Sequence, residues 1–197
     1  MTTTAEPDAV SAPRWVVGDL LRAVALASVA VGASGWGFVG FALFLLVLGG
    51  TMIPRALGAP PSLDVTYCSV LLAGAWAAVL DLYLRFAWLD TVVHAAATGL
   101  IAVVAYVVTV RVRWLPATVP WPGRVVVATG AGTVLALVWE VLEWAGHALV
   151  DDRIQVGYED TLGDLVSGMV GAAIAGALLL SDALLRQPGA RRAGPAR

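Results

Sequence analysis

The sequence predicts an all-α, polytopic membrane protein: a bundle of six transmembrane helices with both termini in the cytoplasm. Of its 197 residues, 59% are hydrophobic and only 13% are charged, and the mean hydropathy is +0.84. A chain of this size with that composition is too apolar for a water-soluble globule, which excludes a disordered protein and an ordinary cytosolic enzyme. All 12 basic residues are arginines and 14 residues are acidic, so no basic run is present to bind nucleic acid.

The first apolar stretch divides into two predicted helices. Residues 23–53 carry no charge, and as one helix they would be about 46 Å long, well beyond the hydrocarbon core of a bilayer. Two glycines and a serine within residues 32–35 favour a turn there, so we expect helices over 15–33 and 35–53. Asp19 and Arg22, near the start of the first helix, are three residues apart and are expected to pair or to reach the interface.

Four further stretches are long enough to cross a bilayer, which takes about 20 apolar residues. They cover residues 65–84, 91–110, 125–148 and 162–181. We expect residues 1–14 to be a polar N-terminal segment without a removed signal peptide, and residues 185–197 to be a disordered basic cytoplasmic tail. Residues 15–184 then form one six-helix transmembrane domain.

The arginines support six helices over five, because short cytoplasmic loops carry the excess of positive charge. With six helices only Arg85 and Arg153 lie outside and the other ten lie inside; with five helices the ratio falls to 8 to 4. The bilayer is the expected partner, nucleic acid is not, and the sequence names no protein partner. A chain rich in Ala, Val, Leu and Arg, without lysine or asparagine, is typical of a GC-rich genome, so we expect the plasma membrane of a bacterium.

Several ionisable side chains lie at the same predicted depth in the membrane. Each such group inside a membrane helix costs roughly 2.5 to 3.5 kcal/mol on insertion scales and therefore needs an explanation. In the six-helix topology the groups lie in or just above the outer half of the bilayer. They are Asp90, His94, Glu140, Glu143, Asp160 and Asp164.

Helical spacing turns these groups toward protein. Glu140, Glu143 and His147 share a face that continues through small residues, Ala136, Gly132 and Ala128. Asp160 and Asp164 likewise continue into a small-residue face, Gly168, Ala172 and Gly176. Small residues allow membrane helices to pack closely, so the sequence predicts a polar pocket between the last three helices that opens outward.

Carboxylates and imidazoles without sulfur form a ligand set for a divalent ion such as Zn, Mn, Fe or Mg. The leading hypothesis is a divalent metal held by His94, Glu140, Glu143 and Asp164, with Asp90 or Asp160 orienting the histidine or joining the ligands. Such a metal suits a hydrolase acting on a lipid-like substrate. No organic cofactor is indicated. The spacing does not match a metalloprotease HExxH motif, an EF-hand loop or a di-iron ExxH pair.

Other interpretations stay open. Glu140 and Glu143 could hydrogen-bond across helices and serve packing alone, and His147 could be a solvated helix end. Asp90 and Asp160 lie at predicted helix starts, where aspartate is favoured as an N-cap. A small transporter that relays protons or a coupling ion is a second functional class, and a structural or partner-binding membrane protein is a third.

Three short patterns carry a family likeness. Asp90-x-x-x-His94, Glu140-x-x-Glu143-Trp144 and Asp160-Thr161-x-x-Asp164 resemble the motifs of the YjdF-like inner-membrane proteins, a bacterial family of uncharacterised polytopic proteins. The likeness extends over about residues 54–181, although Gly99 falls one residue later than the family pattern implies. The resemblance implies a membrane protein with these six polar positions, and it implies no activity.

Overall fold

The computed structural model describes residues 15–185, and every regular element in that range is a helix. They are α1 (Val17–Ala56), α2 (Pro61–Val79), α3 (Leu82–Arg85), α4 (Ala87–Arg111), α5 (Trp121–Leu149), α6 (Tyr158–Leu179) and α7 (Asp182–Leu185). Five of these helices, α1, α2, α4, α5 and α6, are long and apolar enough to cross a membrane. The predicted all-helical class is confirmed; the predicted terminal segments lie mostly outside the described residues.

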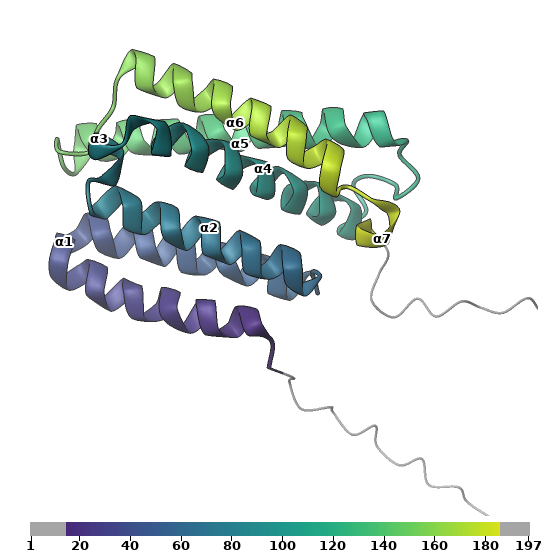
Figure 1. The fold of residues 1–197 in the computed structure, drawn as a ribbon, viewed down its shortest axis with the longest axis horizontal. Coiled ribbons are helices and arrows are strands. Elements are labelled where there is room, and N and C mark those ends of the chain that lie inside the picture. The colour runs from purple at the N-terminus through teal and green to yellow at the C-terminus, as the bar shows by residue number, and fades with distance from the viewer. Residues whose placement is uncertain (1–14, 186–197) are drawn as a thin grey trace, which may run out of the picture.

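The long helix α1 folds back on itself. Gly37 has non-helical backbone angles, φ 63° and ψ −141°, and the chain reverses there (Figure 1). Arg22 Nε donates a hydrogen bond of 2.9 Å to the Thr51 carbonyl, which ties the two arms together. The predicted division of the apolar run is therefore present, but the turn is at Gly37 and not within residues 32–35. Gly32 stays helical because it packs on the opposite arm, where a Cβ would lie 2.7 Å from the Gly40 carbonyl oxygen.

Each of the other four spans begins four residues before its predicted start, and the predicted ends differ most at α2. The prediction carried this helix to residue 84, whereas α2 ends at Val79. Asp81 takes a left-handed conformation, with φ 56°, and the short helix α3 follows it. Aspartate tolerates this conformation better than most residues, so the chain turns without a glycine or proline to mark the place.

The helices form two groups (Figure 1). The two arms of α1 pack with α2 around a small apolar core: Ala25, Phe44, Val47, Leu72 and Ala75. The helices α4, α5 and α6 pack around a second core, which reaches Tyr67 and Cys68 of α2 and so joins the groups. The described chain begins and ends at the same end of the bundle (Figure 1).

Small residues line the contacts among α4, α5 and α6, as predicted. The buried face of α5 contains Ala128, Gly132, Ala136 and Glu140, and that of α6 contains Asp164, Gly168, Ala172 and Gly176. A Cβ on Gly132 would lie 2.8 Å from the Cβ atoms of both Ala102 and Ala172, so three backbones meet there at close range. The carboxylates on the same faces consequently point into protein.

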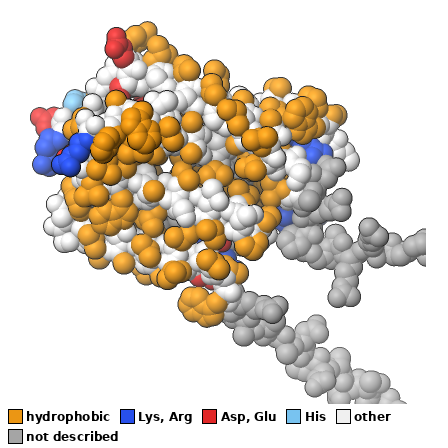
Figure 2. Space-filling model, viewed as in Figure 1, with side chains coloured by type: hydrophobic (Ala, Val, Ile, Leu, Met, Phe, Trp, Pro, Cys, Tyr) orange, Lys and Arg blue, Asp and Glu red, His pale blue; other side chains and the backbone are white. Residues whose placement is uncertain are grey.

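The outer surface of the bundle is apolar. Figure 2 shows hydrophobic side chains over most of the viewed face, with charged groups toward its ends. Large exposed side chains include Val126, Val134, Val141 and Ile174 on the long helices. Trp88, Trp114, Trp121 and Trp144 are also exposed, whereas Trp139 is half-buried. This is the surface expected of a chain surrounded by lipid.

Candidate metal centre

The first two residues of the centre come from the start of α4. This helix begins at Ala87 after Phe86, and no side chain caps it, so Asp90 lies inside the first turn. Asp90 and His94 are one helical turn apart, and Asp90 Oδ1 lies 3.4 Å from His94 Nε2. The N-cap interpretation is wrong for Asp90, and also for Asp160, because the N-cap of α6 is Gly157.

The third residue comes from α6. Asp164 is 7% exposed, and its Oδ2 lies 3.7 Å from His94 Nε2. One ligand atom from each of Asp90, His94 and Asp164 lies within 4.8 Å of the others. Two carboxylates from different helices therefore approach the same nitrogen of one imidazole.

Glu140 approaches the opposite edge of the imidazole. It comes from α5, is 7% exposed, and places Oε1 4.0 Å from His94 Nδ1. The Thr161 side chain of α6 interacts electrostatically with Glu140. The histidine is thus enclosed by carboxylates on both ring nitrogens, contributed by three helices.

The remaining two predicted ligands lie nearby but outside the three-residue group. Glu143 and Asp160 are half-buried and interact electrostatically with the other acids of the centre. The structure brings Asp90, His94 and Asp164 together, adds Glu140 on the other side of the ring, and leaves Glu143 and Asp160 at the margin. The role of each residue in binding metal remains a prediction.

The spacing of the three closest groups suits a small cation. Zinc binds nitrogen and oxygen ligands at about 2.1 Å, which puts tetrahedral ligands about 3.4 Å from one another. The two distances to His94 Nε2, 3.4 and 3.7 Å, are close to that value. An imidazole and two carboxylates are also the ligand types that zinc, manganese and iron share.

Tyr83 is a member of the site region that sequence reasoning missed. It lies on α3, and its hydroxyl donates a hydrogen bond of 2.9 Å to the Gly74 carbonyl of α2. Burial raises the pKa of Tyr83 above its ordinary value, and the charges of Asp90, Glu143 and Asp164 add to the rise. The predicted helix over 65–84 concealed this residue, because nothing in the local sequence marks the turn at Asp81.

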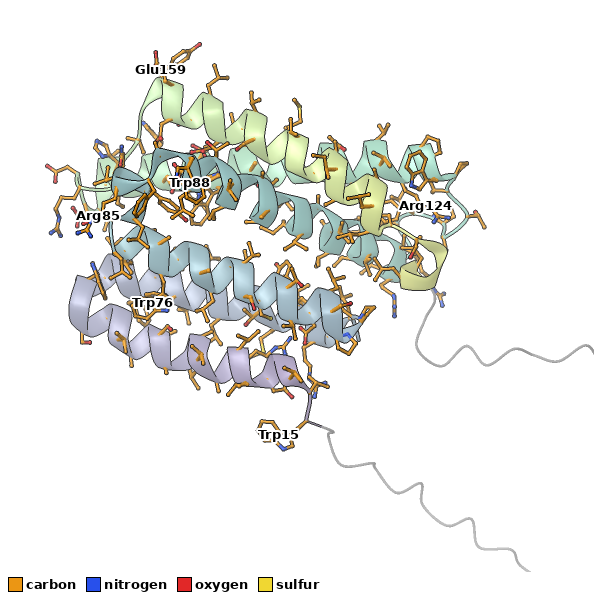
Figure 3. All side chains as sticks on the ribbon, in the orientation of Figure 1. Trp15, Trp76, Arg85, Trp88, Arg124 and Glu159 are labelled. Atoms are coloured by element: carbon orange, nitrogen blue, oxygen red, sulfur yellow. The ribbon has the colours of Figure 1, made fainter. Side chains whose placement is uncertain are left out.

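The centre lies toward one end of the bundle. Figure 3 shows Arg85, Trp88 and Glu159 at the end where α4 and α6 begin, and Arg124 at the opposite end. His147, predicted as a solvated helix end, instead donates through Nδ1 to the Ile154 carbonyl at 2.7 Å. It therefore anchors the loop between α5 and α6 and takes no part in the three-residue group.

A second charged cluster occupies the other helical group. Arg22 of α1 and Asp64 of α2 are 6% and 4% exposed and form a two-pronged ion pair. Asp19 pairs with Arg22 at 3.1 Å, as the sequence predicted, and with Arg55 at 3.3 Å. These contacts link both arms of α1 to α2. Sequence reasoning missed the role of Asp64, because the predicted helix began one residue after it.

Comparison with known proteins decides the family. A family model described as "Predicted membrane protein (DUF2238)" matches residues 15–184, nearly the whole described chain. The chain belongs to this family. The resemblance to the YjdF-like membrane proteins is consistent with that assignment. No curated protein and no solved structure matches the chain.

Proposed function

We propose that this DUF2238 protein binds one divalent metal ion at Asp90, His94 and Asp164. The observation that carries the proposal is the approach of two carboxylates from α4 and α6 to the same nitrogen of His94, at 3.4 and 3.7 Å. The ligand oxygens of Asp90 and Asp164 also lie within 4.8 Å of each other. Without a cation, two carboxylates that close repel each other, and a divalent ion relieves the repulsion.

Glu140 has a different role in this proposal from the one the sequence predicted. It lies on the Nδ1 side of His94, whereas Asp90 and Asp164, the residues that would hold the ion, lie on the Nε2 side. Histidines that bind metals commonly direct the other ring N–H to a carboxylate, which fixes the tautomer and the ring orientation. Glu140 is therefore an orienting group, whereas Asp90, first considered for that task, is a ligand.

The arrangement suits hydrolysis better than a purely structural metal. Catalytic zinc sites have three protein ligands and one open position, at which a bound water becomes a nucleophile near neutral pH. One imidazole and two carboxylates supply three ligands here. Because the helices that carry them are membrane spans, the substrate we propose is a lipid-like molecule that reaches the centre from the bilayer. The predicted topology, with six crossings and both ends in the cytoplasm, places the centre on the outer side of a bacterial plasma membrane.

The test is the metal content of the purified protein after equilibration with zinc or manganese and removal of free ions. We expect about one ion per chain in the wild type and a large loss in Asp90→Asn and Asp164→Asn. Asp152→Asn is the matched control, because it removes the same charge from an exposed loop position. Equal metal in all four proteins, or none in any, would overturn the proposal.

One observation favours transport as a second candidate. The cluster around Arg22 and Asp64 gives the chain buried charges in its other helical group as well as in the metal centre. Buried ionisable residues in transporters mark ion pathways. Proteoliposomes separate the candidates: a transporter takes up zinc or manganese in a manner that depends on His94, and a metal-binding hydrolase does not.

A further inference from the structure

A groove lies beside the metal centre, where the end of α5, the following loop and the start of α6 meet. It has a volume of about 410 Å³, within the range of small-molecule sites. Trp144, Val156, Leu162 and Leu165 form its apolar walls, and Tyr158 and Thr161 add hydroxyl groups to its lining. The groove therefore suits the hydrocarbon part of a ligand.

The loop wall of the groove is held in place. Ile154 packs on α5 so closely that a Cβ on Gly146 would lie 2.9 Å from its Cδ1. His147 donates to the carbonyl of the same residue at 2.7 Å. Arg153 and Asp151 pair across the outer turn of the loop at 2.7 Å. A groove with an anchored wall is preformed, so a ligand does not bear the cost of ordering it.

Thr161 connects the groove to the metal centre. Its side chain is part of the groove lining, and it lies three residues before Asp164 on the same helix, so both share one face of α6. Thr161 also interacts electrostatically with Glu140, whose Oε1 is 4.0 Å from His94 Nδ1. The apolar groove thus leads to a polar, charged end. A ligand that satisfies both parts is an amphiphile, with its chain along Leu162 and Leu165 and its headgroup near Glu140.

The surroundings of the groove favour a lipid over a soluble molecule. Leu162 and Val166, on the membrane-spanning α6, are 48% and 50% exposed, so this side of the helix faces acyl chains. Trp144 and Tyr158, at the rim, are 62% and 84% exposed. Exposed tryptophan and tyrosine beside an apolar span are typical of the membrane interface, where headgroup and chain of a phospholipid meet.

The charge of the centre selects among headgroups. Glu159 and Asp160 lie in the first turn of α6, between the lining residues Tyr158 and Thr161, and Asp164 follows one turn further on. Arg153 of the adjoining loop is paired with Asp151, so this end of the groove is acidic. An ammonium-bearing headgroup is attracted to it, and a headgroup with net negative charge is repelled.

We propose that the groove binds one acyl chain of a zwitterionic phospholipid with a primary ammonium headgroup, and that this lipid is the class of ligand presented to the metal centre. The inference rests on the proposed function for the ion itself. The lipid site itself is inferred from the groove, from its link to the centre through Thr161 and from its acidic end.

The experiment compares binding of dioctanoyl phosphatidylethanolamine and dioctanoyl phosphatidylglycerol to the detergent-purified full-length protein, by native mass spectrometry. We expect the ethanolamine lipid to bind more tightly to the wild type. Leu165→Trp fills the groove and should weaken that binding about tenfold, as the loss of about two buried methylene groups implies. Ile174→Trp, at a position on α6 that is 55% exposed and nine residues beyond Leu165, is the matched control and should bind as the wild type does.

A second variant and a metal assay keep the result interpretable. Thr161→Val retains the shape of the side chain but removes the hydroxyl facing Glu140, and should reduce the preference for the ethanolamine lipid. Zinc content is measured in every protein, so loss of lipid binding with zinc retained supports the groove proposal separately from the metal proposal. Equal binding of both lipids, or unchanged binding in Leu165→Trp and Thr161→Val, would overturn it, whatever the zinc content.

Discussion

Replacing Gly171 with alanine tests whether the close packing of α4 and α6 holds the metal centre together. Gly171 lies two turns along α6 from Asp164 and packs against the backbone of Ala95, the neighbour of His94. A Cβ there would overlap the Ala95 carbonyl oxygen and lie 2.6 Å from its carbonyl carbon. Ordinary contacts of a Cβ begin at 3.4 Å, and the atoms concerned are backbone, so no side chain can move aside.

The two helices must therefore separate by at least about 0.8 Å in Gly171→Ala, because the carbonyl oxygen overlaps the new Cβ more deeply than the carbonyl carbon does and close-packed interiors cannot absorb the overlap. The same displacement beside His94 would widen its 3.7 Å distance to Asp164 to about 4.5 Å or more, well beyond the roughly 3.4 Å between tetrahedral ligands of one zinc ion. Overpacking costs about 1 to 3 kcal/mol, partly offset by the gain of about 1 kcal/mol when alanine replaces glycine in a helix. We expect a net loss of up to about 2 kcal/mol in unfolding free energy, with zinc binding weakened about tenfold or more.

The assay is thermal unfolding in detergent, followed by tryptophan fluorescence, together with zinc titration by calorimetry. Gly163→Ala is the matched control on the same helix, because a Cβ at Gly163 has no atom of another residue within 4 Å. This control should be neutral or stabilised by up to about 1 kcal/mol and should bind zinc normally. If Gly171→Ala unfolded at the same temperature as Gly163→Ala and bound zinc equally well, the packing argument would be refuted.

Three further predictions concern the charged groups. Asp64→Ala should lower the unfolding free energy by about 3 to 5 kcal/mol, because it leaves the buried Arg22 without its two-pronged partner. Thermal unfolding measures this loss, and a loss below about 1 kcal/mol would contradict the prediction. Zinc affinity should fall as the pH is lowered from about 7.5 to about 5.5, because His94 and the carboxylates coordinate only when deprotonated. Calorimetry at both pH values measures the affinity, and a constant affinity would argue against these ligands. The hydrogen bond from Arg153 lowers the pKa of Asp151 to about 2. The pair should therefore order its loop at every pH above the ordinary carboxyl range, and the loop should lose this order only as the pH falls toward 2. Asp151→Asn should accordingly speed hydrogen exchange in residues 150–157 at neutral pH, and unchanged exchange would show that the pair does not order the loop.

The sequence allowed the spans to be predicted because hydropathy is a property of each segment alone. The turn in the first apolar run was harder to place, since five glycines lie in residues 32–49 and local rules favour the first pair. The structure uses Gly37 because Gly32 is needed where the two arms cross close to Gly40. That requirement belongs to the packed hairpin and is not visible in the local sequence.

The sequence predicted the site about as completely as it predicted the spans. Spacing of three and four residues correctly turned Glu140 and Asp164 toward protein, on faces that the structure buries. Spacing did not show which ring nitrogen of His94 each carboxylate faces, because that depends on how α4, α5 and α6 cross. The same limit concealed the partnership of Arg22 with Asp64, 42 residues away, whose charges are matched only in three dimensions.

The most direct test of the account is the position of a bound metal in crystals of the protein grown with zinc, read from an anomalous difference map. The account predicts a single strong peak about 2.0 to 2.2 Å from His94 Nε2 and from a carboxylate oxygen of both Asp90 and Asp164. Glu140 should face Nδ1 and make no bond to the ion. A peak bound elsewhere, or no peak between these three side chains, would contradict the central claim.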